Sequence, residues 1–67
     1  MNVGIVGFGS IGTEVAKALI AGVENFSLIG VVSRSKENAQ KRISQLKHNI
    51  EIFDLDTLIK KSDIIID

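Results

Sequence analysis

The chain opens with Val3-Gly4-Ile5-Val6-Gly7-Phe8-Gly9-Ser10-Ile11-Gly12, an apolar run that leads into three glycines spaced G-x-G-x-x-G. The apolar part, residues 3–6, is typical of a buried β-strand. Apolar residues at helical spacing follow directly, so the glycines stand between a strand and a helix. Alone, the glycine spacing is a weak signal, but in this context it predicts a turn that binds the phosphates of a dinucleotide.

Each glycine of this turn has a physical reason to be glycine. Gly7 lets the chain turn sharply, Gly9 removes the Cβ that would hold the backbone away from a pyrophosphate, and Gly12 lets the helix pack closely. The first N–H groups of the helix have no intrahelical acceptor, and the helix dipole adds positive potential there, so an anion is bound without a lysine. The alternative is a turn that binds nothing. The predicted cofactor-binding residues of the turn are Gly7, Phe8, Gly9, Ser10, Ile11 and Gly12.

The next segments predict a helix, a buried strand and a second helix. Over residues 10–23, apolar residues recur at three- and four-residue spacing. Residues 26–32 form an apolar run typical of a parallel strand that is buried on both faces. Ser35 is predicted to cap a helix that extends to about Leu46. Its solvent-exposed face is predicted to carry Lys41, Arg42 and Gln45.

The last third of the chain predicts strand, helix and strand again. Residues 50–53 are predicted as a third strand, Asp54 as the cap of a short helix, and residues 64–66 as a fourth strand. The order is β-α-β-α-β-α-β, which favours parallel pairing through right-handed crossovers. The predicted fold is therefore α/β, the N-terminal portion of a Rossmann-type doubly wound parallel sheet. The short helix is predicted to face inward with Leu55, Leu58 and Ile59.

The end of the second predicted strand carries the choice between NAD and NADP. An NAD-selective fold usually places Asp or Glu about 20 residues past the last glycine, where it binds the ribose 2′-hydroxyl. Here the residues are Ser33, Arg34 and Ser35, with no carboxylate. Two hydroxyls and a guanidinium can bind a 2′-phosphate, so we expect NADP or NAD, with NADP favoured. Two alternatives stay open: Ser35 and Arg34 serve only as cap and solvated charge, or Glu37 restores NAD binding.

Size and charge exclude several classes of protein. The 67 residues allow one small domain, which buries roughly 60% of its unfolded surface. The formal net charge is zero, so no long-range field attracts nucleic acid or a membrane surface. Cysteine is absent and no apolar run approaches the ~20 residues of a membrane span. We therefore expect a cytoplasmic protein whose partners include neither nucleic acid nor membrane.

No catalytic or metal-binding residue is predicted within the chain. The single histidine, His48, stands between Lys47 and Asn49 in a polar connection and is predicted to lie on the surface. Asp67 follows the last predicted strand, beyond the point where the strand order reverses, and ligands bind at that crevice. It can border the nicotinamide half of the cofactor or simply be a strand-end carboxylate in water.

Four segments together resemble the start of L-aspartate dehydrogenases: residues 3–12, 31–34, 53–59 and 62–67. Homoserine dehydrogenases and sugar-type oxidoreductases share the first of them. In aspartate dehydrogenases the last apolar strand usually ends in Glu followed by small residues, whereas here the acid is Asp67. The resemblance implies oxidative deamination of L-aspartate to iminoaspartate, or the reverse amination of oxaloacetate, with NAD or NADP, in pyridine nucleotide synthesis. It also implies that the catalytic histidine lies in a later domain.

We expect residues 1–67 to form an incomplete dinucleotide-binding domain, inactive alone, whose catalytic and substrate domain is absent from this chain. The edge strand at residues 64–66 and an incompletely covered apolar face predict a longer parent protein or a homo-oligomer. The main hypothesis is an NAD(P)-dependent dehydrogenase acting on a small molecule. The alternatives are a nucleotide-sensing regulatory module without catalysis and a methyltransferase using S-adenosylmethionine, although the third glycine fits a pyrophosphate better.

Overall fold

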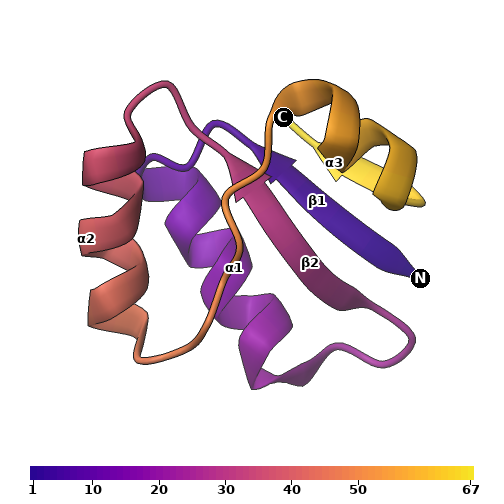
Figure 1. The fold of residues 1–67 in the computed structure, drawn as a ribbon. Helices are drawn as coiled ribbons and strands as arrows, with labels where there is room; N and C mark the ends of the chain where they lie inside the picture. The colour runs from indigo at the N-terminus through magenta and orange to yellow at the C-terminus, as the bar shows by residue number, and fades with distance from the viewer.

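Three parallel strands form the sheet of this protein, in the order β2-β1-β3. The computed structural model describes all of residues 1–67. Strands and helices alternate as the sequence predicts, except that α3 follows α2 with no full strand between them (Figure 1). The elements are β1 (Asn2–Val6), α1 (Ser10–Gly22), β2 (Ser27–Val32), α2 (Lys36–Leu46), α3 (Leu55–Lys61) and β3 (Ile64–Ile66). The predicted α/β fold with a parallel sheet is confirmed.

The predicted third strand, residues 50–53, is reduced to one parallel bridge between Val31 and Ile52. Two backbone hydrogen bonds hold it: the N–H of Val31 donates to the Glu51 carbonyl at 2.9 Å, and the N–H of Phe53 donates to the Val31 carbonyl at 2.8 Å. The segment stays short because Asp54 follows at once as the cap of α3. It nevertheless extends the sheet beyond β2, so the sheet grows outward from β1 in both directions, as in a doubly wound fold.

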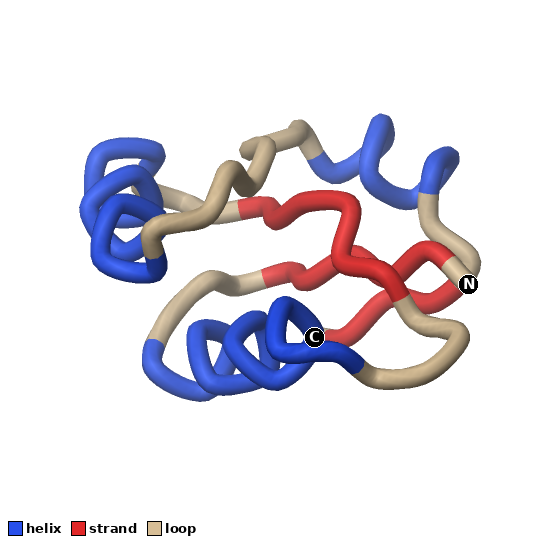
Figure 2. Tube along the Cα trace, turned by 90° about the horizontal axis from the view of Figure 1, so that it is seen from below, coloured by secondary structure: helices blue, strands red, loops and turns tan.

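Helices cover both faces of the sheet, and α1 and α3 lie on opposite sides of it (Figure 2). On the first face, a buried cluster joins the strands to α1 and α2; its members are Ile5, Phe8, Ala16, Val31 and Ala39. On the second face, Leu58 of α3 is fully buried over Gly4, where a Cβ would lie 2.7 Å from the Leu58 Cγ. Glycine in β1 therefore allows α3 to approach the sheet closely.

The inward face of α3 is narrower than the sequence predicts. Only Leu58 is buried, whereas Leu55 is 47% exposed and Ile59 is 52% exposed. The side chains of Leu58 and Ser62 occupy the space over Gly4, and the aromatic ring of Phe53, from the preceding segment, lies over the neighbouring Gly30. The prediction that Leu55 and Ile59 face inward is therefore wrong.

Side chains cap two of the three helices, as predicted. At α2, the Ser35 hydroxyl accepts a hydrogen bond from the N–H of Asn38 at 3.2 Å. At α3, the Asp54 carboxylate accepts one from the N–H of Thr57 at 2.8 Å. Hydrogen bonds from Thr57 hold the pKa of Asp54 below its ordinary value. None of the helices has both the length and the apolar composition to cross a membrane.

Candidate functional site

The glycine turn joins the end of β1 to the start of α1. Gly7 has a φ of +86°, a conformation that glycine adopts at little cost, and its N–H donates to the Val32 carbonyl at 2.9 Å. Gly12 is buried, and a Cβ on it would lie 2.6 Å from the Gly7 carbonyl oxygen and 3.3 Å from Ile5 Cγ2. Close packing therefore excludes a side chain at Gly12, whereas Gly7 requires glycine because of its positive φ.

Gly9 differs from the other two glycines of the turn. Its φ is −95°, which any residue adopts, and a Cβ placed on it would meet no protein atom within 4 Å. The protein itself therefore does not require glycine at this position. The open space in front of Gly9 is available to a ligand that must approach the backbone.

The first turn of α1 presents N–H groups that have no partner. Gly9 is the N-cap residue of the helix and offers no side chain as a cap, and the first turn contains no acidic residue. The N–H groups of Ser10, Ile11 and Gly12 donate to no protein acceptor. The positive end of the helix dipole therefore remains uncompensated, which favours an anion.

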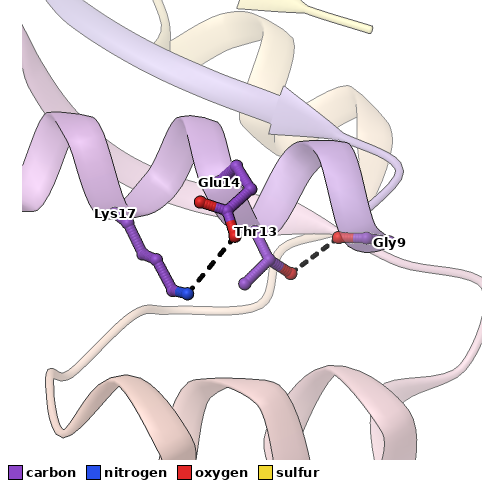
Figure 3. A network of polar contacts seen from close by, with 4 residues as sticks. All are labelled: Gly9, Thr13, Glu14 and Lys17. Carbon is purple, nitrogen blue, oxygen red and sulfur yellow. Dashed lines mark hydrogen bonds and ion pairs between the residues drawn. The ribbon is translucent and has the colours of Figure 1, made fainter.

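The side chains of α1 strengthen this arrangement. The Gly9 carbonyl accepts hydrogen bonds from the N–H of Thr13 at 2.9 Å and from the Thr13 hydroxyl at 2.6 Å, and Figure 3 shows the second of these. Both bonds hold that carbonyl oxygen toward the helix, so that it is turned away from an incoming anion. The first acid along α1, Glu14, is paired with Lys17 at 3.3 Å on the exposed surface (Figure 3).

On the β2 side, the turn borders a hollow of about 360 Å³, here called the polar hollow. It contains three of the turn residues and all three residues predicted at the end of the second strand. Phe8 belongs to the buried core and is 4% exposed, so the polar hollow borders the core at this residue. The lining residues are Gly7, Phe8, Gly9, Ser33, Arg34, Ser35, Asn38 and Arg42.

The loop after β2 is held by its own hydrogen bonds. The Ser33 hydroxyl donates to the Ser35 carbonyl at 3.1 Å and accepts from the Ser35 N–H at 3.3 Å. Both serines are half-buried, whereas Arg34 is exposed. No carboxylate lines the polar hollow, and Glu37 lies outside it, 3.9 Å from Lys41. The loop therefore offers the Ser35 hydroxyl and the Arg34 guanidinium as free donors, but no carboxylate of the kind that binds the ribose 2′-hydroxyl in NAD-selective folds.

Two lining residues of the polar hollow were missed by the sequence analysis. Arg42 was predicted to lie in water, but it is half-buried and lines the hollow together with Asn38. Both belong to α2, at positions three and seven residues after its cap Ser35. This spacing places the three residues on one face of a helix that begins at the candidate site. The helical spacing from the predicted cap was the signal that could have identified Asn38 and Arg42.

On the β3 side, the turn borders a smaller hollow of about 170 Å³, here called the apolar hollow. Ile11 is 82% exposed at this place, although it belongs to the apolar pattern of the helix. Asp67, directly after β3, lies at the same hollow and thus on the side of the turn opposite Ser33. The lining residues are Ile5, Val6, Gly7, Ile11, Gly12, Val15, Ile66 and Asp67.

The remaining candidate features of the chain lie away from the glycine turn. His48 is exposed in the connection after α2. No group of three or more His, Cys, Asp or Glu residues could hold a metal ion. The largest hollow, about 520 Å³, lies between α2 and residues 50–52 and shares no residue with the turn.

Comparisons with known proteins agree with the geometry of the turn. The comparison with curated proteins finds no match. Among solved structures, UDP-N-acetylglucosamine 3-dehydrogenase GnnA from Acidithiobacillus ferrooxidans is similar over 100% of this chain, with 26% sequence identity and a TM-score of 0.74. This chain corresponds to 21% of that chain. Residues 1–66 match the family model described as D-isomer specific 2-hydroxyacid dehydrogenase, NAD binding domain. The chain therefore belongs to this family of NAD-binding dehydrogenase domains.

Proposed function

We propose that this chain binds a nicotinamide dinucleotide through its diphosphate at the glycine turn, as the cofactor-binding part of a dehydrogenase. The observation that carries the proposal is the start of α1, where the N–H groups of residues 10–12 have no acceptor and Gly9 faces open space. A diphosphate supplies the acceptors and the negative charge that this helix end lacks.

The two hollows beside the turn fit the two halves of such a cofactor. We propose that the polar hollow takes the adenosine ribose and the apolar hollow takes the nicotinamide side. Gly7 lines both hollows, so one extended molecule bound across the turn can reach both. The exposed Ile11 side chain offers an apolar surface on the nicotinamide side, and Asp67 offers a carboxylate there.

We propose that NADP(H) is preferred to NAD(H). Ser33 and Ser35 place hydroxyls at the polar hollow and Arg34 adds a guanidinium, which binds phosphate oxygens with charge-assisted hydrogen bonds. The family is described as NAD binding, so the preference rests on these three residues and on the absence of a lining carboxylate.

The comparisons do not support L-aspartate dehydrogenase over other dehydrogenases. An aspartate, a 2-hydroxy acid and the 3-position of a sugar share one chemistry: a hydride leaves a carbon that carries an amine or a hydroxyl. We propose this reaction class, in which the bound nicotinamide accepts or returns the hydride. In this proposal, residues of this chain hold and orient the cofactor, and residues outside the chain bind the substrate.

Replacing Arg34 with Ala tests the cofactor preference. Because the substitution removes a donor to the 2′-phosphate, we expect the affinity for NADPH to fall about threefold to tenfold while the affinity for NADH is unchanged. Titrations can follow the fluorescence of the reduced nicotinamide, since the chain contains no Trp or Tyr. An unchanged NADPH affinity would show that Arg34 does not hold the 2′-phosphate.

A further inference from the structure

The polar hollow contains a second arginine that the proposed function does not yet use. Arg42 lies on α2, six residues after its first residue Lys36, and lines the hollow together with Arg34 and Ser35. Its side chain is half-buried, whereas Arg34 is exposed on the loop. A side chain on a helix is held in place more accurately than one on a loop, so Arg42 is the better-positioned cation.

Neither arginine is neutralised by the protein. The two ion pairs of the chain join Lys17 to Glu14 and Lys41 to Glu37, and no side-chain hydrogen bond involves a guanidinium. No acid lines the polar hollow. Two arginine residues therefore line one hollow without a counter-charge, an arrangement that favours a dianion.

The same helix offers further donors on the same face. Ser35 uses its hydroxyl as an acceptor for the Asn38 N–H, so its O–H remains free to donate, and the Asn38 side-chain amide has no partner within the protein. These groups can complete the hydrogen bonds of a phosphate monoester, which has three terminal oxygens.

We propose that Arg42 determines cofactor selectivity by binding, together with Arg34, the 2′-phosphate of NADP(H). This inference rests on the proposed function, because it assigns one part of the same cofactor. Arg42 contributes more than Arg34 to the preference for NADP(H), because Arg42 is held by a helix and is partly shielded from solvent.

The test compares Arg42→Gln with Lys41→Gln in the 67-residue chain. Both substitutions remove one positive charge from neighbouring positions of α2, but Lys41 is exposed and does not line the polar hollow. We expect Arg42→Gln to weaken NADPH binding about tenfold and to leave NADH binding unchanged. Lys41→Gln should change neither affinity. Equal weakening of both cofactors by Arg42→Gln, or equal effects of the two variants on NADPH, would overturn the assignment.

Arg42→Lys provides a second variant in case the glutamine destabilises the chain. Lysine keeps the charge but loses the planar fork of donors, so we expect it to retain part of the preference for NADPH. A lysine variant with full NADPH affinity would contradict a direct guanidinium contact with the phosphate.

Adenosine 2′-monophosphate separates this inference from the proposed function, because it carries the 2′-phosphate but no diphosphate. We expect it to shift the Arg42 side-chain N–H resonance in the unmodified chain and to leave the amides of residues 9–12 in place. If NADPH and NADH bind but the nucleotide monophosphate leaves Arg42 unmoved, the inference fails and the proposed function stands. If the monophosphate moves Arg42 while no dinucleotide affects the turn, the proposed function fails and the phosphate site stands.

Discussion

The start of α1 and the start of α3 differ in whether the protein supplies acceptors for the first N–H groups of the helix. Each helix begins with N–H groups that lack an intrahelical acceptor. At α3, Asp54 supplies a carboxylate to Thr57, and Asp56 adds a second acid in the first turn. At α1, Gly9 supplies no side chain and the first turn has no acid. The protein satisfies the start of α3 from its own residues and leaves the start of α1 unsatisfied where the glycine turn and both hollows meet. This contrast is the basis of the proposal that an external anion binds at α1.

Giving α1 a cap of its own should produce the largest effect. In Gly9→Asp the new carboxylate accepts from the first-turn N–H groups and occupies the anion position. We expect a chain slightly more stable without cofactor, by a few tenths of a kcal/mol, because Asp exceeds Gly as an N-cap. We expect both NADPH and NADH to bind about 100-fold more weakly. The added negative charge repels the diphosphate, and the new carboxylate occupies the N–H groups that would otherwise bind it. Urea unfolding and cofactor titration measure the two effects.

Gly9→Ala is the control for this variant. A Cβ at this position meets no protein atom, so the fold should persist, and the added methyl group obstructs only a bound ligand. We expect weakened binding of both cofactors with no gain in stability. A Gly9→Asp variant that binds the cofactors as well as the unmodified chain would show that the uncapped helix start is not the anion site.

Removing a cap from a helix that has one should cost stability. In Ser35→Ala, the N–H of Asn38 loses its acceptor at the start of α2. We expect the free energy of unfolding of the cofactor-free chain to fall by about 1 kcal/mol. Urea denaturation measures it, with Ser35→Asp as the control that keeps a cap. An unchanged stability of Ser35→Ala would mean that the caps of this protein contribute little, which would weaken the contrast with α1.

Acid should weaken the cap at the start of α3 and leave the start of α1 unchanged. This is the smallest effect on stability that we expect in the series. Hydrogen bonds from Thr57 hold the pKa of Asp54 below its ordinary value. The stabilisation from this cap is therefore present above the ordinary pKa of an aspartate and is lost as the pH falls through the lowered pKa. We expect the amide resonance of Thr57 to titrate in that range, and the amides of residues 10–12 to show no such transition. In Asp54→Asn, which caps without titrating, the transition at Thr57 should disappear.

Local signals in the sequence were sufficient for most of the fold. The cap residues Ser35 and Asp54 mark the starts of α2 and α3, and the apolar runs mark all three strands of the sheet. These features depend on residues close together in the chain, where spacing determines which groups can meet.

Apart from the predicted third strand, which the adjacent cap Asp54 cuts short, the errors concern contacts between distant segments. The burial of Leu58 without Leu55 and Ile59 depends on Gly4 at the other end of the chain, over which Leu58 packs beside Ser62. The place of Arg42 at the polar hollow depends on how α2 lies against the glycine turn. Hydrophobic periodicity assigns a charged residue to solvent and does not reveal when the solvent-facing side of a helix also borders a ligand site.

The amide resonances at the starts of α1 and α3 provide the most direct test of the account. A folded, isotope-labelled chain is titrated with NADPH and with NADH while the backbone N–H signals of residues 9–12 and of Leu55, Asp56 and Thr57 are followed. The account predicts large, saturable shifts at residues 9–12 with both cofactors and none at α3. Unchanged signals at residues 9–12 under saturating concentrations, or equal shifts at both helix starts, would contradict it.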